Sequence, residues 1–253
     1  ATSDGTVIDP LEGLDDLRAQ RIRFINDADQ RIREDYLRIL RFFRFSAWYG
    51  NKHLGLDAEA LSAIAEHLAG LERLSKERIG AEMIKLLAAP DPSSSVAAMR
   101  SSGVLQNILA GAHDRLLSLF VHLETVNGLP SDTMGRLAIL GGQDVQHQLR
   151  LSNKQTKTYE TLRASMANTM PPHELGYRYG EHIALISIAL RAALFEIPIN
   201  KPDLFSAKRG ALAQFPLSGK DLTDRFQDAE LGRVLKDCEA NWIASEFSLS
   251  KED

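Results

Sequence analysis

The chain has 253 residues, a formal net charge of −4, 44% hydrophobic residues and 25% charged residues, as in a globular protein of one large or two ordinary domains. Its single cysteine, Cys238, excludes an internal disulfide framework and a CxxC zinc site. The longest largely apolar run, Ile183–Leu190, is too short to cross a bilayer, and no signal-peptide pattern opens the chain. We therefore expect a cytoplasmic protein without a membrane segment.

The net charge hides two basic stretches. Residues 18–44 carry a charge of +4 and residues 150–220 carry +5, whereas residues 1–17 and 221–253 each carry −5. Separated basic patches on an acidic protein suit a polyanion that is held at chosen places. Chance clustering on solvated helix faces explains the charge pattern equally well, so charge alone leaves both readings open.

The start of the chain is its only β-like part. An Asp-Gly turn signal precedes Thr6–Ile8, and Arg21–Ile25 shows a weak alternation of polar and apolar residues. From about Asp29 onward the periodicity is helical and is interrupted by glycine and proline. The sequence thus predicts a mainly α, elongated multi-helix array with a short β portion at its N-terminus. Two strands cannot bury a face alone, and the chain begins with Ala1 rather than Met, so we expect part of a longer protein.

The stretch RIREDYLRILRFFRF, residues 31–45, combines arginines, acids and large apolar residues. On a single helix, Arg31, Glu34, Asp35, Arg38 and Arg41 would share an arc of about 120°. A surface face with salt bridges is the simplest explanation. The planar guanidinium groups, together with Phe42 and Phe45 on or beside the same arc, favour a binding site. An accepting Asp and a donating Arg one turn apart could read the edge of a nucleobase.

This stretch, together with the preceding DPLEGLDDL, resembles the class II nucleotidyltransferases, which are the CCA-adding tRNA enzymes and related bacterial poly(A) polymerases. The family pattern Asp-Pro-x-x-Gly-x-x-Asp-Leu is met by Asp9, Pro10, Gly13, Asp16 and Leu17, and Glu-Asp-x-x-Arg-x-x-Arg is met by Glu34, Asp35, Arg38 and Arg41. The resemblance implies that Asp35 and Arg38 hydrogen-bond the base of an incoming CTP or ATP. Glu34 and Arg41 would support them. Asp35 and Arg38 should then lie within reach of each other in an open cleft.

Two further segments extend the resemblance. SKERIGAEMIKLL resembles a family helix that braces the base-reading helix, with Glu77 and Arg78 as supports, and FPLSGKDL with the later Trp242 resembles the family's tail. The family's organisation implies a remnant of the catalytic head in 1–28, a neck in 29–90, a helical body in 91–200 and a helical tail in 201–253.

The family's catalytic head carries a Gly-Gly phosphate loop, an Asp-x-Asp metal pair and an Arg-Arg-Asp-Phe motif, and none of these precedes Ala1. We therefore expect no catalytic residue and no metal site in this chain, Mg²⁺ in the missing head, and no activity of the chain alone. Asp27 and Asp29 are spaced like a metal pair, but their position before a helix favours capping by Asp29.

Basic residues further along the chain are candidate RNA contacts. Lys154, Lys157 and Arg163 are expected on about one face of a helix that could follow an RNA backbone, although an exposed helix with solubilising lysines is equally compatible. A looser cluster, Lys201, Lys208, Arg209 and Lys220, lies near Phe205 and Phe215, where we expect phosphate contacts supported by aromatic rings, above all at Lys208, Arg209 and Lys220.

The sequence therefore predicts the nucleotide-reading and RNA-binding part of a CCA-adding tRNA nucleotidyltransferase, with tRNA, CTP and ATP as partners. A poly(A) polymerase keeps the same Glu-Asp-x-x-Arg-x-x-Arg helix and remains an alternative. A non-catalytic α-helical RNA-binding or scaffold protein is an alternative of another class. The sequence does not indicate the oligomeric state.

Overall fold

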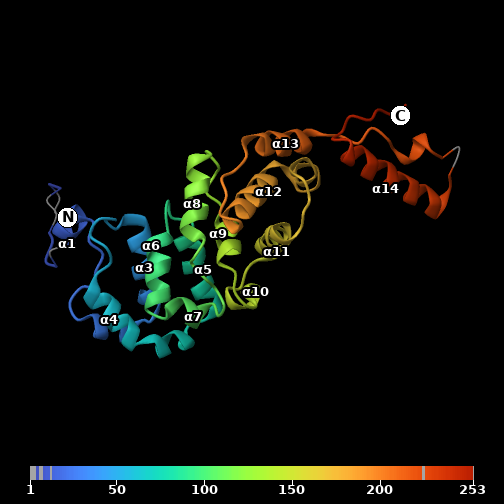
Figure 1. Ribbon diagram of the computed structural model, residues 1–253. Coiled ribbons are helices and arrows are strands. Elements are labelled where there is room, and N and C mark those ends of the chain that lie inside the picture. The colour runs from blue at the N-terminus through green and yellow to red at the C-terminus, as the bar shows by residue number, and fades with distance from the viewer. Residues whose placement is uncertain (1–3, 6–7, 12, 224–225, 253) are drawn as a thin grey trace. The chain divides into compact units, whose positions relative to one another are not determined.

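The computed structural model describes residues 4–5, 8–11, 13–223 and 226–252, and every regular element in these ranges is a helix (Figure 1). The predicted mainly α class is confirmed. The described Arg21–Ile25 segment forms no strand, so the expected β portion is wrong there, because a lone extended segment has no partner strand with which to pair. Thr6 and Val7 lie outside the described residues.

The chain divides into two compact units, residues 1–160 and 161–253, with the division inside one helix. The predicted boundaries at 28, 90 and 200 follow the family's organisation and stay predictions. The helices of the first unit are α1 (Gly13–Ala19), α2 (Ala28–Glu34), α3 (Leu37–Tyr49), α4 (Ala58–Glu66), η1 (Leu68–Arg73), α5 (Lys76–Leu87), α6 (Ser93–Ser101), α7 (Val104–Ile108), α8 (Leu117–Val126), α9 (Thr133–Leu140) and α10 (Val145–Gln148). Helix α11 (Asn153–Ala167) crosses the division, and α12 (Pro172–Leu194), α13 (Lys201–Leu212), η2 (Gly219–Asp221) and α14 (Asp228–Ala244) follow.

Helix α3 lies at the centre of the first unit and packs against α5 and α6. Its apolar face is fully buried at Ile39, Leu40 and Phe43, and Met83 and Leu86 of α5 are buried as well. Burying each such side chain contributes about 1.5–3 kcal/mol. This packing fixes the rotation of α3 about its axis, and therefore fixes which of its side chains remain at the surface.

The helix expected over residues 31–45 is interrupted at Asp35. The backbone of Asp35 is extended (φ −156°, ψ 105°), which ends α2 at Glu34, and its carboxylate accepts a hydrogen bond from the N–H of Leu37 at 3.1 Å. Aspartate competes for local backbone N–H groups in this way and so favours helix starts over helix interiors. The expectation of one continuous helix is therefore wrong, and a new helix, α3, begins at Leu37.

A buried ion pair fixes the end of α5. Arg136 of α9 is 1% exposed and donates to Glu124 of α8 and to the carbonyl oxygens of Leu87 and Ala89 at 2.8 and 2.5 Å. These carbonyls belong to the C-terminal end of α5, where no further helical turn can satisfy them. Burial raises the pKa of the Glu124 carboxyl, although the Asp132 N–H and Arg136 oppose that change. The guanidinium thus joins α8 and α9 to the helix that carries Arg78 and Glu82.

In the second unit, α12 and α13 approach each other with almost no side chain between them. A Cβ atom at Gly176 would lie 1.9 Å from the carbonyl oxygen of Ala207, and one at Gly210 would lie 1.9 Å from the carbonyl oxygen of His173. Glycine is therefore required at both positions by the close approach of the two backbones. Trp242 of α14 is buried among the rings of Tyr177, Phe215 and Phe247.

Candidate nucleotide- and RNA-binding site

Four arginines surround a hollow of about 290 Å³ beside the N-terminal half of α3. It is lined by Ile22, Arg23, Phe24, Ile25, Arg31, Arg38, Arg41, Phe42 and Phe45. The guanidinium groups offer planar hydrogen-bond donors, and the phenylalanine rings offer apolar faces. This combination suits a flat, polar and negatively charged ligand such as a nucleotide.

Glu34 holds two of these arginines. Its Oε2 accepts from Arg31 Nη1 at 3.0 Å and from Arg38 Nη1 at 2.5 Å, and Arg38 Nη1 also lies 2.9 Å from the carbonyl oxygen of Arg31. The hydrogen bond from Arg38, followed by the charge of Arg31, lowers the pKa of the Glu34 carboxyl. Helix α2 ends at Glu34, and Glu34 therefore fixes the direction of the Arg38 side chain across the break between α2 and α3.

Asp35 does not line this hollow. Both of its carboxylate oxygens lie against Arg78 Nη2 of α5, at 3.1 and 3.2 Å, and Arg41 Nη1 is 3.9 Å away. The carboxylate is partly exposed, with 28% of its side chain accessible. The structure thus brings Asp35 to Arg78 and Arg41, while Arg38 is held by Glu34. Their roles in reading a base stay predictions.

Glu82 of α5 lies behind the arginines of α3. It is buried, and its carboxylate lies 2.8 Å from Arg44 Nη1 and 3.8 Å from Arg41 Nε. Glu77, which the sequence grouped with Arg78 as a support, instead pairs with Arg150 at 3.1 Å on an exposed surface. Of the acids on α5, Glu82 is therefore the one that contacts the arginines of α3.

The two phenylalanines expected beside the charged arc have different environments. Phe42 is 4% exposed and stacks on Phe24, with ring centroids 5.6 Å apart and an interplanar angle of 17°. Phe45 is 39% exposed, and the guanidinium of Arg44 lies 4.4 Å from its ring centroid. Phe42 is thus mainly a core residue at the edge of the hollow, and Phe45 offers a ring face to solvent.

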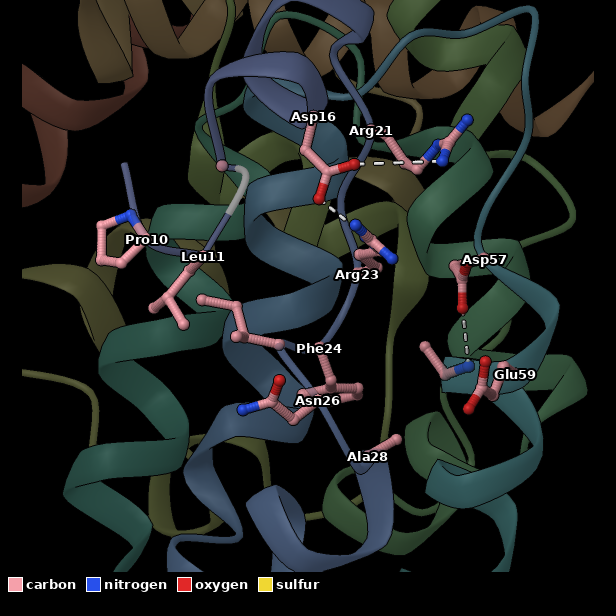
Figure 2. A pocket seen from close by; sticks show the side chains of 13 residues that line it. Pro10, Leu11, Asp16, Arg21, Arg23, Phe24, Asn26, Ala28, Asp57 and Glu59 are labelled. Atoms are coloured by element: carbon pink, nitrogen blue, oxygen red, sulfur yellow. Dashed lines mark hydrogen bonds and ion pairs between the residues drawn. The ribbon is translucent and has the colours of Figure 1, made fainter. Parts of the chain in front are cut away.

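A second hollow of about 480 Å³ is lined by residues of the 21–28 segment, of α1 and the turn before it, and of the start of α4 (Figure 2). Figure 2 shows Asp16 between Arg21 and Arg23, and its oxygens lie 3.9 Å from Arg21 Nη1 and 2.6 Å from Arg23 Nε. Arg23, Phe24 and Ile25 line both hollows. The sequence did not indicate these residues as part of a site. The alternation of polar and apolar residues in 21–25 was the only signal for them.

The family-type residues Asp9 and Gly13 lie together at the start of α1. The Asp9 carboxylate accepts from the N–H groups of Leu14 at 2.7 Å and Gly13 at 2.9 Å, and these bonds lower the pKa of the Asp9 carboxyl. In this structure Asp9 therefore holds the beginning of α1, which carries Asp16 to the edge of the second hollow.

The residues predicted to contact RNA are exposed, but they do not form one face. Lys154, Lys157 and Arg163 all belong to α11. At 100° per residue, Arg163 projects about 180° away from Lys154, so the expectation of a shared face is wrong. On α13, Lys208 lies 3.5 Å from Glu181, and Arg209 pairs with Glu246. Lys220 is exposed in η2.

Within the residues that the structure describes, no group of three His, Cys, Asp or Glu side chains could hold one metal ion. Asp27, part of the Asp-x-Asp lookalike, caps α2 through Gln30 N–H at 2.9 Å, and Asp29 lies 2.7 Å from His67 Nε2. Asp27 is therefore the cap, where Asp29 was expected. Among the described helices, none is long and apolar enough to cross a membrane.

The chain is similar to known tRNA nucleotidyltransferases. Residues 53–116 match the family described as "Probable RNA and SrmB- binding site of polymerase A". The chain is 28% identical to the mitochondrial CCA tRNA nucleotidyltransferase 1 of Mus musculus over 264 aligned residues, covering 99% of this chain and 61% of that protein. It is 37% identical to a CCA-adding enzyme of Streptococcus gordonii over 46% of this chain and 29% of the relative.

The fold matches solved CCA-adding enzymes. The CCA-adding enzyme of Bacillus stearothermophilus in complex with CTP superposes with a TM-score of 0.73 at 22% identity, over 97% of this chain and 66% of that one. The Thermotoga maritima enzyme in complex with tRNA-CCA gives a TM-score of 0.60 at 16% identity, over 94% of this chain and 67% of that one.

The chain therefore has the helical fold that nucleotidyltransferases of this kind share, with the arginine motif placed at a hollow on α3. In sequence it is similar to CCA-adding enzymes and to a mitochondrial CCA tRNA nucleotidyltransferase, and residues 53–116 match a family described by its relation to polymerase A. It spans about three fifths of the length of the mouse relative.

Proposed function

We propose that this chain is the nucleotide-reading and RNA-holding part of a CCA-adding tRNA nucleotidyltransferase. Such an enzyme adds C and A to tRNA 3′ ends from CTP and ATP without a nucleic-acid template. The observation that carries the proposal is the arginine-lined hollow built by Arg31, Arg38 and Arg41, in a chain whose relatives are named for CCA addition.

The proposed reading of the base uses fixed donors and acceptors. An ionised carboxylate only accepts hydrogen bonds and a guanidinium only donates them. Cytosine and adenine both present an amino donor beside a ring-nitrogen acceptor on their pairing edges, and guanine and uracil do not. In our proposal Arg38, oriented by Glu34 at the wall of the hollow, donates to the ring nitrogen. Asp35 does not line the hollow but lies 3.9 Å from Arg41 of its wall, and we propose that it accepts from the amino group when a nucleotide is bound. The other arginines of the hollow hold the phosphates.

We propose that the metal ion used in nucleotidyl transfer is not held by the residues described here. Because no described cluster suits a metal ion, the residues here do not fit the Mg²⁺ that nucleotidyl transfer uses, and we derive no step through it. We propose that Mg²⁺ and the catalytic carboxylates belong to the part of the relatives' length that this chain does not span. The chain alone should then bind nucleotide and RNA without transferring nucleotides. The expected cytoplasmic location also stays a prediction.

A poly(A) polymerase of the same family is the second candidate, because the matched family is described by its relation to polymerase A. The two activities need the same base reader for ATP and differ in the product. A non-catalytic RNA-binding or scaffold role, the third possibility, would require no preference among nucleotides at the hollow.

The test has two parts. The 253-residue chain is titrated with CTP, ATP, UTP and GTP, and we expect binding of CTP and ATP over UTP and GTP. The natural protein that contains this chain is incubated with tRNA ending at the discriminator base plus CTP and ATP, and the 3′ ends are sequenced. A CCA end that stops supports the proposal, and a run of A supports a poly(A) polymerase. Equal binding of all four nucleotides without extension would leave the non-catalytic role.

A further inference from the structure

Helix α3 carries a second feature, which shares only Phe45 with the hollow. Its last two turns expose three aromatic rings, Phe45 at 39%, Trp48 at 42% and Tyr49 at 57%. Their centroids lie 6.0 Å apart for Phe45 and Tyr49, and 6.4 Å apart for Trp48 and Tyr49. We call these three residues the aromatic patch. An isolated exposed ring needs no explanation, but three adjacent rings on one helix do.

The aromatic patch is oriented although it is not buried. Trp48 donates its indole N–H to the carbonyl oxygen of Lys85 at 2.8 Å, which fixes the ring edge on α5. Arg44 lies over the ring of Phe45. With its only hydrogen-bond donor already satisfied, Trp48 offers a partner nothing but its π-face. A fixed ring that keeps its face exposed is suited to stacking.

The aromatic patch continues the line of arginines from the hollow. At 100° per residue, Arg38, Arg41, Phe45, Trp48 and Tyr49 fall within an arc of about 100° on α3. Phe45 also lines the hollow itself. From Arg38 to Trp48 the helix rises ~15 Å, which corresponds to roughly four nucleotides at ~3.4 Å each along one strand. The arginines and the aromatic rings thus form one continuous stripe on α3, which is about as long as a short single strand of RNA.

We propose that the aromatic patch is a stacking platform for the unpaired 3′-terminal nucleotides of the RNA that is extended. The inference rests on the proposed function, since it takes the occupant of the neighbouring hollow to be the incoming nucleotide. Stacking on aromatic rings tolerates any base, which suits an end whose last nucleotide changes with each addition. The charge of the adjacent arginines favours this polyanionic occupant over an apolar protein surface.

The test uses the fluorescence of Trp48 in the 253-residue chain. The probe is an RNA hairpin of acceptor-stem length with a three-nucleotide 3′ overhang, and the same hairpin with a blunt end is the control. Subtracting the signal of Trp48→Phe isolates Trp48, because the other tryptophan, Trp242, is 5% exposed. We expect saturable quenching of Trp48 by the overhang hairpin, little quenching by the blunt one, and about tenfold tighter binding of the overhang form.

Variants separate stacking from general attraction. Phe45→Ala and Tyr49→Ala should each remove most of the overhang's advantage and leave blunt-hairpin affinity unchanged. Phe195→Ala, which removes a ring that is 66% exposed elsewhere, should leave both affinities unchanged. Equal quenching by both hairpins, or an undiminished overhang advantage in both patch variants, would overturn the proposal. So would self-association of the chain that Trp48→Ala abolishes, since the patch would then join two copies.

These outcomes differ from failure of the proposed function. If the chain discriminates CTP and ATP from UTP and GTP but the overhang has no effect on Trp48, only the stacking platform is wrong. If nucleotide discrimination is absent while the overhang is preferred, the patch binds single-stranded RNA and the base-reading proposal fails.

Discussion

At the scale of single residues, Arg38 is where a structural role and a functional role can be separated. It pairs with Glu34 and caps the Arg31 carbonyl, yet its side chain is 33% exposed and lines the hollow. A partly exposed ion pair contributes only about 0–1 kcal/mol to stability. A guanidinium that contacts a base contributes about 1–3 kcal/mol of discrimination. The two roles therefore predict effects of different size in different measurements.

We expect Arg38→Ala to reduce the preference for CTP and ATP by roughly ten- to a hundredfold, with RNA affinity nearly unchanged. The measurement is competitive nucleotide binding, and misincorporation of UTP or GTP in the natural protein. Arg33→Ala is the matched control, because Arg33 is an exposed arginine of α2 that does not line the hollow. A variant that melts early but still selects CTP and ATP would assign Arg38 to the fold alone.

The Glu34 carboxyl gives a pH prediction at the same scale. Its pKa is lowered in the folded chain, chiefly by the Arg38 hydrogen bond. Its contribution to stability is therefore fully present above the unfolded value of 4.5 and is lost as pH falls through the lower folded value. We expect Glu34→Gln to lower the melting temperature at pH 6–7, and the difference from wild type to shrink as the pH falls below 4.5 toward the lower folded pKa. A difference that grows in acid would contradict the sign of this linkage.

At the scale of elements, the periodicity of the sequence predicted a mainly helical chain but not the break between α2 and α3. Ser75, Asp57 and Asp132 each accept from an N–H of the following helix, which is chemistry visible in the sequence. Asp35 makes the same kind of local bond inside a periodic stretch, where periodicity alone predicts continuation. Its main ion-pair partner, Arg78, lies 43 positions away, so only the packing of α3 on α5 brings the two together.

The α12–α13 crossing gives the prediction that belongs to this scale. Gly176→Ala or Gly210→Ala puts a methyl group about 1.9 Å from a carbonyl oxygen of the other helix, so the helices must separate. We expect a loss of about 1–3 kcal/mol and faster amide hydrogen exchange in α12 and α13. Gly232→Ala in α14 is the control, because nothing lies within 4 Å of its added Cβ. It should be neutral or stabilising, by up to about 1 kcal/mol. Equal effects at all three glycines would indicate helix propensity alone.

At the scale of the whole molecule, the segregated charge predicts how the chain holds RNA. Its net charge of −4 opposes a polyanion, so binding must depend on the local patches. Sequence composition revealed those patches but not their geometry, since α11 turns Lys154 and Arg163 to opposite sides. Two of the α13 cations also have acidic neighbours, Lys208 with Glu181 and Arg209 with Glu246, which phosphate would have to displace.

We therefore expect Lys154 and Lys220, both exposed, to contribute more than Lys208 or Arg209 to affinity for an RNA hairpin. Each phosphate contact releases counterions, so log Kd should rise linearly with log salt concentration. Lys154→Ala or Lys220→Ala should reduce that slope by about 0.7–0.9. Arg233→Ala, which removes an exposed charge of similar size from the acidic 221–253 stretch, should leave the slope unchanged. If RNA binding depended only on the net charge of the molecule, the three variants would change the slope equally. An equal change in Lys154→Ala, Lys220→Ala and Arg233→Ala would therefore contradict direct phosphate contacts at Lys154 and Lys220.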